Sequence, residues 1–253
     1  MHNDAIIPFI LFGIILLMHL YDYDIENFDT ITQPKIILLV ISSNDNGHAR
    51  WRAERNSWLT YFKQTPNVTA ELIECGCKED DHSIVKSYNC DENYMPGIFN
   101  KTILSIKKNI GKYNYYIRTN LSTFIIKSRL TEYLEEKKPP YGGVYCSLPD
   151  SWVGGWGIIM NDIAADELQK MAPKYKDASN EVPDDVLIGK ILKTSDITCE
   201  HGDDMGYIWD YNLSFDRNIH IIDEKPTNIF IRLYTDNLSE YDVVIKNLYN
   251  IYG

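Results

Sequence analysis

The stretch that decides the fold is Lys35-Ile36-Ile37-Leu38-Leu39-Val40-Ile41-Ser42. Its continuous apolar run is rich in β-branched residues, which predicts a strand buried on both faces, as in a parallel sheet. The polar turn Ser42-Ser43-Asn44-Asp45-Asn46-Gly47 follows it. We therefore expect an α/β sheet with a polar edge at the carboxyl end of this first strand.

Helical and extended patterns alternate downstream of this strand. Predicted helices cover residues 50–62, 96–110, 129–136, 160–171, 185–192 and 241–252, and extended segments cover 70–74, 113–118, 141–147, 219–222 and 229–234. The alternation indicates a mostly parallel central sheet flanked by helices. Ligands of such sheets bind at the carboxyl ends of the strands, where polar segments follow Ile41 and Ile117. In the first helix, Trp51, Arg55 and Trp58 share the apolar face, which favours a buried partner for Arg55.

Composition narrows the class of protein. A chain of 253 residues suits one domain with a short appendage, and a net charge of -11 argues against a nucleic-acid surface. A phosphate-bearing small ligand needs only a local cluster of Arg and Lys. The five cysteines, an odd number without zinc-site spacing, allow one or two disulfides if the domain is lumenal; they are Cys75, Cys77, Cys90, Cys146 and Cys199.

The N-terminus predicts a membrane anchor. Residues 5–20 are almost wholly apolar and span about 24 Å as a helix, against roughly 30 Å of hydrocarbon. No small-residue cleavage site follows, so a retained signal anchor is favoured over a removed signal peptide. The anchor would comprise residues 1–21 and contact the membrane through residues 5–21. An acidic stem over 22–34 then leads to the domain at 35–253, a type II arrangement. The alternative is an apolar N-terminal helix packed on the domain.

Five Asn-x-Ser/Thr sequons are possible glycosylation sites in a lumenal protein: Asn67, Asn100, Asn120, Asn212 and Asn237. Several sequons are expected by chance in a chain this rich in Asn.

Two short segments carry candidate chemistry. In Gly154-Gly155-Trp156-Gly157, glycines let the backbone approach a bulky ligand, and the indole offers a flat apolar face. Asp184-Asp185 stands at a predicted helix start, where a carboxylate can accept a proton from a hydroxyl. Together they predict a sugar-transfer site. The alternatives are turn glycines, a core tryptophan and carboxylates that cap the helix, which is the role we expect for Asp184.

Five segments in order between residues 35 and 190 carry a family resemblance. They are Arg52 to Trp58, Asp91-Glu92-Asn93-Tyr94 through Asn100-Lys101-Thr102, Tyr116 to Phe124, Gly155-Trp156-Gly157 to Asp162, and Asp184-Asp185-Val186 to Gly189. As an ordered set they resemble the motifs of inverting β-1,3-galactosyltransferases and Fringe-like glycosyltransferases. The C-terminal third is less similar, apart from the region of Arg232.

The resemblance implies a GT-A fold that transfers a hexose, with inversion, from a nucleotide-sugar such as a UDP-sugar to a hydroxyl of a glycan or glycoprotein. It implies a type II membrane protein facing the Golgi or ER lumen. It assigns the catalytic base to Asp185 and sugar or acceptor contacts to Gly155, Trp156 and Gly157. The residues it places near the donor are Arg52, Arg55, Lys101, Arg118, Asn120, Ser122 and Arg232.

One departure concerns the metal, and it leaves the metal ligands unassigned. Where the family has Asp-x-Asp to hold a divalent ion, usually Mn²⁺, this chain has Asn120-Leu121-Ser122. Neutral amide and hydroxyl oxygens hold such ions poorly without carboxylates. Transfer is then metal-independent, with counter-charge from Arg118, Lys101 or Arg232; or other carboxylates recruit the ion; or the site is inactive. The rival functions are an inactive, membrane-anchored carbohydrate-binding protein and a nucleotide-sugar hydrolase.

Overall fold

A computed structural model describes residues 33–43, 48–76, 84–147, 151–199 and 205–253. Within it, Pro34–Gly253 forms one compact unit. The predicted anchor, and the stem up to residue 32, lie outside the described residues. Among the described helices, none combines the length and the apolar character needed to cross a membrane.

A six-stranded sheet in the order β3-β2-β1-β4-β9-β6 forms the centre of the unit. Its strands are β1 (Ile36–Ile41), β2 (Val68–Cys75), β3 (Val85–Tyr88), β4 (Tyr115–Asn120), β6 (Tyr141–Gly143) and β9 (Ile158–Asn161). The first four are parallel, and β9 runs antiparallel to both of its neighbours. The expected α/β class is confirmed, with a sheet that is mixed because of β9.

Strand β1 is buried on both faces, as its apolar run predicts. Ile36, Leu38 and Val40 pack in one hydrophobic cluster, whereas Ile37 and Leu39 pack in another. Successive side chains of a strand point to opposite faces, so an uninterrupted apolar run is stable only between two covering layers.

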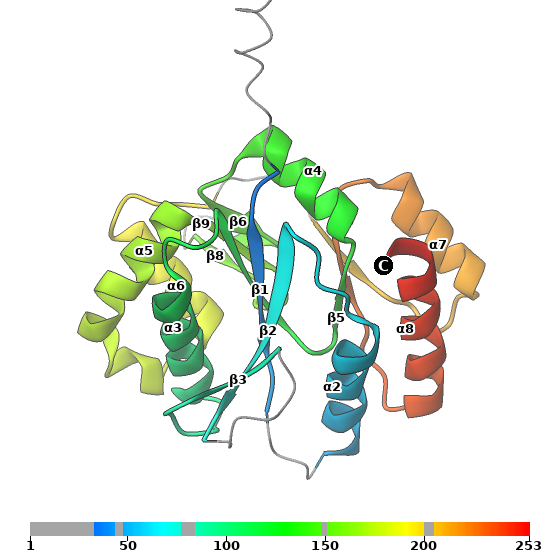
Figure 1. Ribbon diagram of the computed structural model, residues 1–253, viewed down its shortest axis with the longest axis horizontal. Helices are drawn as coiled ribbons and strands as arrows, with labels where there is room; N and C mark the ends of the chain where they lie inside the picture. The colour runs from blue at the N-terminus through cyan, green and yellow to red at the C-terminus, as the bar shows by residue number, and fades with distance from the viewer. Residues whose placement is uncertain (1–32, 44–47, 77–83, 148–150, 200–204) are drawn as a thin grey trace, which may run out of the picture. The chain divides into compact units, whose positions relative to one another are not determined.

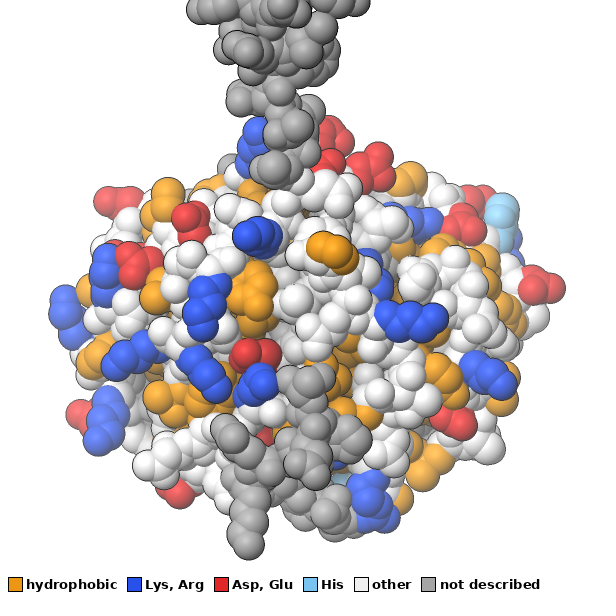
Figure 2. All heavy atoms as spheres, in the orientation of Figure 1, with side chains coloured by type: hydrophobic (Ala, Val, Ile, Leu, Met, Phe, Trp, Pro, Cys, Tyr) orange, Lys and Arg blue, Asp and Glu red, His pale blue; other side chains and the backbone are white. Residues whose placement is uncertain are grey.

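Helices supply those layers on both faces of the sheet (Figure 1). Trp58 of α2 (Ala49–Tyr61) and Leu130 of α4 (Lys127–Lys137) belong to the first cluster. The second cluster contains residues of α3 (Gly97–Asn109), α5 (Asp162–Met171) and α6 (Asp184–Lys193). Lys107 and Lys108 in the last turn of α3 interact favourably with the negative end of the helix dipole. Lys and Arg side chains gather over this part of the surface (Figure 2).

A second, three-stranded sheet stands beside the first. It contains β10 (Gly206–Ile208), β11 (Phe230–Arg232) and β5 (Thr123–Ile125), packed with α7 (Phe215–Glu224) and α8 (Leu238–Tyr252) around a third cluster. A short ribbon pairs β7 (Cys146–Ser147) with β8 (Trp152–Val153). Two 3₁₀ turns, Ala172–Tyr175 and Ala178–Asn180, lead into α6.

One assignment of secondary structure from the sequence is wrong, and one helix starts later than predicted. Residues 219–222, expected as a strand, lie inside α7, where the side chain of Ser214 caps the helix by accepting from the N–H of Arg217. A short apolar run fits either a strand or one helix face, so the cap is the stronger signal. The helix expected from residue 160 begins at Asp162, because Asn161 caps it and Met160 belongs to β9.

Two disulfides join segments of the unit: Cys75 with Cys90, and Cys146 with Cys199. They agree with the expected one or two bridges. The first connects the end of β2 to the segment before α3, and the second ties β7 to the segment after α6. Structural disulfides are typical of proteins that mature in an oxidising compartment.

Candidate functional site

The strand order defines where a ligand crevice is expected. From β1 the chain passes through α2 to β2 on one side, whereas β4 pairs with β1 on the other side. This is a topological switch point, and open α/β sheets bind ligands outside the carboxyl ends of the strands there. Ile41 and Asn120 are register partners at that edge, and polar residues follow both strands.

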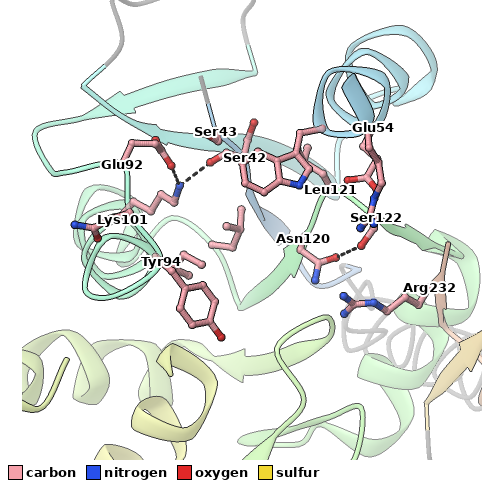
Figure 3. Close-up of a pocket in the computed structure, with 15 residues that line it drawn as sticks. Ser42, Ser43, Glu54, Glu92, Tyr94, Lys101, Asn120, Leu121, Ser122 and Arg232 are labelled. Atoms are coloured by element: carbon pink, nitrogen blue, oxygen red, sulfur yellow. Dashed lines mark hydrogen bonds and ion pairs between the residues drawn. The ribbon is translucent and has the colours of Figure 1, made fainter. Parts of the chain in front are cut away.

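A cavity of about 450 Å³ lies at this position, within the size range of small-molecule sites. Residues after β1 and β4 form its floor, and α2, α3 and β11 contribute its walls (Figure 3). The residues that line it are Ile41, Ser42, Ser43, Arg50, Trp51, Glu54, Glu92, Asn93, Tyr94, Ile98, Lys101, Asn120, Leu121, Ser122 and Arg232.

Two exposed aromatic side chains stand at the cavity. Trp51 is 40% exposed and stacks on His48 with ring centroids 5.1 Å apart, and Tyr94 is 63% exposed. Trp51 therefore does not share the buried face of α2 with Trp58, whose indole N–H donates to the carbonyl of Leu121 (3.0 Å). Aromatic rings left open beside a cavity offer flat faces to a base or sugar. From the sequence, Trp51 was named only on an apolar helix face and Tyr94 only within a family motif, and neither was assigned to the site.

Lys101 is a buried cation on the α3 wall of the cavity. Its ammonium group donates to the carbonyl of Ser42 (2.6 Å) and forms an ion pair with Glu92. Glu92 also accepts from the backbone N–H of Cys75 (2.7 Å). The charge of Lys101, predicted to face the donor, is thus matched by a carboxylate of the same cavity.

A second matched pair lies on α2. The Arg50 guanidinium is 2.9 Å from Glu54 and lies over the ring of Tyr234, 4.1 Å from its centroid. Burial raises the pKa of Glu54, and the hydrogen bond from Arg50 opposes that shift. The pair leaves little net charge on this wall.

Arg232 differs from these two cations. Among the described residues, it has no ion-pair partner, and its guanidinium lies 5.8 Å from the centroid of the Trp156 ring. Figure 3 shows it pointing into the cavity toward Asn120. Burial, the largest cause, lowers the pKa of Arg232; Glu54 opposes the shift, and the charges of Arg50 and Arg118 add to it. Glu54 is already paired with Arg50 and acts on Arg232 only at longer range, so the cations that line the cavity outnumber its carboxylates by one positive charge.

The segment expected to replace a metal-binding motif is already hydrogen-bonded. The amide oxygen of Asn120 accepts from the hydroxyls of Ser122 (3.0 Å) and Thr123 (2.8 Å). Throughout the described ranges, no group of three His, Cys, Asp or Glu side chains could hold an ion. A neutral, occupied amide oxygen does not fit the oxygen-rich, anionic ligand set that Mn²⁺ or Mg²⁺ requires, so the residues of this segment do not fit such an ion.

Arg118 and Asp184 form a buried ion pair behind the cavity, with Nη2 and Oδ2 2.5 Å apart. Burial raises the pKa of Asp184, and the attraction of Arg118 opposes that shift. Arg118, predicted to face the donor, has its guanidinium in an ion pair with Asp184 of α6. Asp184, predicted to cap that helix, also accepts a hydrogen bond from the backbone N–H of Asp185 in the first turn.

Asp185 lies against the glycine loop. Its carboxylate accepts from the backbone N–H of Gly155 (3.1 Å) and of Val186 (2.8 Å). A Cβ at Gly155 would come within 2.8 Å of Arg118 Nη1 and 3.0 Å of Asp185 Oδ2, so the close approach requires glycine. The carboxylate is half-buried and does not line the cavity.

Trp156 joins the loop to the cavity. Its carbonyl accepts from the hydroxyl of Thr119 (2.9 Å), and one face of its ring lies toward Arg232. The ring is only 7% exposed, so it packs as a core residue in this structure. Gly157 is equally enclosed, since a Cβ there would lie 2.8 Å from the ring of Phe230.

The remaining predicted donor residues lie away from the cavity lining. Arg52 is exposed on α2. Arg55 is 2.8 Å from Glu74, a buried carboxylate that also accepts from the hydroxyl of Ser42 (2.7 Å). The buried partner expected for Arg55 is therefore confirmed. Of the predicted donor set, the cavity unites Lys101, Asn120, Ser122 and Arg232.

The comparisons with known proteins find similar chains among solved structures alone. No protein-family model and no curated protein match the sequence. Among solved structures, the chain is similar to a glycosyltransferase involved in the glycosylation of the major capsid of PBCV-1, at 10% identity and a TM-score of 0.46, covering 85% of this chain and 100% of that one. It is also similar to the glycosyltransferase GlyE of Streptococcus pneumoniae TIGR4, at 10% identity and a TM-score of 0.44, covering 87% of this chain and 64% of that one.

Proposed function

We propose that the chain is a glycosyltransferase that moves a hexose from a nucleotide-sugar, such as a UDP-sugar, to a hydroxyl of a glycan or glycoprotein, with inversion. The observation that carries the proposal is the position of Asp185. Its carboxylate accepts a hydrogen bond from the backbone N–H of Gly155. The next residue of that loop is Trp156, and the guanidinium of Arg232, which lines the cavity, lies over the Trp156 ring. A carboxylate and a cationic cavity at one sheet edge are the parts that such a transfer needs.

The reaction is a direct displacement. Asp185 takes the proton of the acceptor hydroxyl, whose oxygen forms the new bond to the anomeric carbon as the bond to the nucleotide diphosphate breaks. Each carboxylate oxygen of Asp185 accepts one backbone hydrogen bond and retains capacity for another. A general base of this kind contributes about 10²–10⁴-fold to the rate.

The cellular setting belongs to the same proposal. The apolar segment at residues 5–20 would hold the chain as a single-pass type II membrane protein, with the domain in the Golgi or ER lumen. The two disulfides support an oxidising compartment, because such bonds do not persist in a reducing cytosol.

Donor turnover tests the proposed reaction. The 253-residue chain, incubated with UDP-sugars and a panel of glycan acceptors, is expected to release UDP and to form a glycosylated product. Asp185→Asn should lower the rate about 10²–10⁴-fold with an unchanged melting temperature. The matched control is Asp216→Asn, because Asp216 also lies in the first turn of a helix, α7, and is exposed. Equal rates for wild type and Asp185→Asn would refute the base assignment.

A specific observation favours a second candidate, a non-catalytic protein that binds a nucleotide or carbohydrate. The two carboxylates that line the cavity, Glu54 and Glu92, are each paired with a cation, and Asp185 lies outside the lining. Binding of UDP without product across the donor and acceptor panel would support this candidate. UDP release that no acceptor stimulates would instead indicate a nucleotide-sugar hydrolase.

A further inference from the structure

A diphosphate ligand needs positive charge or hydrogen-bond donors around its oxygens. Three cations line the cavity: Arg50, Lys101 and Arg232. The first two face carboxylates of the same cavity, Glu54 and Glu92. Their charges are largely cancelled before any ligand enters, so the attraction for an anion falls to Arg232.

The fold holds Arg232 in place. Its strand, β11, is paired on both sides, with Ile208 of β10 and Thr123 of β5 as the register partners of Arg232. Its carbonyl also accepts from the backbone N–H of Trp209 (3.0 Å). With the backbone fixed and the guanidinium over the Trp156 ring, the charged group is directed into the cavity (Figure 3). Such pre-organisation reduces the entropy lost when an anion binds.

Asn120 presents its donor side to the same space. Ser122 and Thr123 both donate to its amide oxygen, which fixes the orientation of the side chain. Within the described residues, its NH₂ group has no hydrogen-bond acceptor, and Asn120 lines the cavity where the guanidinium of Arg232 points toward it (Figure 3). A carboxylate at this position would repel a phosphate unless a cation stood between them. An amide N–H₂ can donate to phosphate directly.

We propose that Arg232 and the amide group of Asn120 together bind the phosphate oxygens of the donor directly, so that binding needs no divalent metal. The assignment of the anion as a nucleoside diphosphate rests on the proposed function, whereas the phosphate chemistry rests on the cavity. Arg232 supplies the charge and a planar fork of N–H donors, and Asn120 supplies a neutral donor.

Calorimetric titration of the 253-residue chain with UDP, uridine and inorganic pyrophosphate, each with EDTA or with Mn²⁺, tests this site. UDP is expected to bind in EDTA, with an affinity that Mn²⁺ changes less than about 2-fold. Arg232→Gln should weaken UDP about 10–100-fold and leave uridine unchanged, because a hydrogen bond to a charged group is lost. Arg232→Lys should restore part of the affinity. The control is Arg217→Gln on the exposed face of α7, which should bind like wild type.

Asn120→Asp provides an independent test that keeps the shape of the side chain. The added negative charge should weaken UDP binding in EDTA, and Mn²⁺ should restore it by bridging the carboxylate and the phosphates. Circular dichroism of each variant confirms that it is folded. UDP binding by wild type only with Mn²⁺, or equal affinities for wild type and Arg232→Gln, would overturn the proposal.

The outcomes separate this site from the transferase proposal. Metal-free binding of UDP that depends on Arg232, with no sugar transfer, supports the anion site and counts against the enzyme. Binding of pyrophosphate but not UDP keeps the anion site and removes the nucleotide. Sugar transfer that requires Mn²⁺ and is unaffected by Arg232→Gln supports the enzyme and overturns the site.

Discussion

Arg118 and Arg232 make opposite use of the same side chain a short distance apart. Arg118, on β4, is closed into a buried pair with Asp184. Arg232, on β11, faces a cavity in which no described carboxylate pairs with it. A matched buried charge contributes to the architecture, whereas an unmatched charge at a cavity is available to a ligand. The partner of an arginine, rather than its burial, therefore indicates whether the side chain stabilises the fold or is available to a ligand.

The largest expected effect is a loss of stability when Arg118 is replaced. Arg118→Met leaves the carboxylate of Asp184 buried without its partner, which should cost about 3–5 kcal/mol of unfolding free energy. In a domain of this size that is a fall of roughly 10 °C in melting temperature. Denaturant unfolding measures it. The double variant Arg118→Met with Asp184→Leu should recover much of the loss, and a single-variant loss under about 1 kcal/mol would show that the pair is not buried as described.

The next largest effect is expected at the glycine loop, where Gly155 lies close to Arg118 and Asp185. Gly155→Ala introduces a Cβ 2.8 Å from Arg118 Nη1 and 3.0 Å from Asp185 Oδ2, so the loop or the carboxylate must move. We expect a loss of about 1–3 kcal/mol in stability and a fall in transfer rate. Gly142→Ala is the matched control, because a Cβ there meets nothing within 4 Å. Equal stability and rate for the two variants would contradict the tight contact.

Replacing Arg232 should affect ligand binding rather than stability. Arg232→Met removes a charge that burial and neighbouring cations disfavour, so the unfolding free energy should change by less than about 1 kcal/mol, or rise, while UDP affinity falls. Thermal unfolding of this variant beside Arg118→Met makes the comparison. A destabilisation as large as that of Arg118→Met would mean that Arg232 is also part of the architecture.

The smallest effect concerns the pH dependence of stability at Glu54. Burial raises the pKa of this carboxyl above its ordinary 4.5, so the folded state retains the proton after the unfolded state has released it. The stability contributed by the protonated group is complete below the unfolded pKa and is lost as pH rises through the folded pKa. Relative to Glu54→Gln, wild type should therefore lose stability as pH rises above 4.5. Parallel unfolding curves measured from pH 4 upward for both proteins would be the contrary result.

The parts of the fold that follow from local pattern were predictable. The run Ile36–Ile41 fixes β1, since only a strand covered on both faces accommodates it. The loop at Gly155 and the carboxylate of Asp185 were also singled out from the sequence, and the structure brings them into contact. The strand predicted at 219–222 was wrong because a short apolar run fits a helix face equally well.

The allocation of charges could not be predicted. Arg118, Lys101 and Arg232 all fit the pattern of phosphate-facing cations, and the sequence does not show which of them has a carboxylate partner. Asp184 on α6 pairs with Arg118, and Glu92, before α3, pairs with Lys101. Which cation stays unmatched depends on tertiary placement, which residue spacing does not encode. The exposure of Trp51 and Tyr94 at the cavity depends on it in the same way.

A crystal structure of the chain with UDP, grown in the presence of EDTA, would show whether Arg232 and Asn120 hold the diphosphate. We expect diphosphate oxygens at about 2.7–2.9 Å from the guanidinium of Arg232 and the amide nitrogen of Asn120, with Arg118 still paired to Asp184. A diphosphate held elsewhere, or one that enters the cavity only when an ion bridges it to Asn120 and Ser122, would contradict direct binding by Arg232 and Asn120.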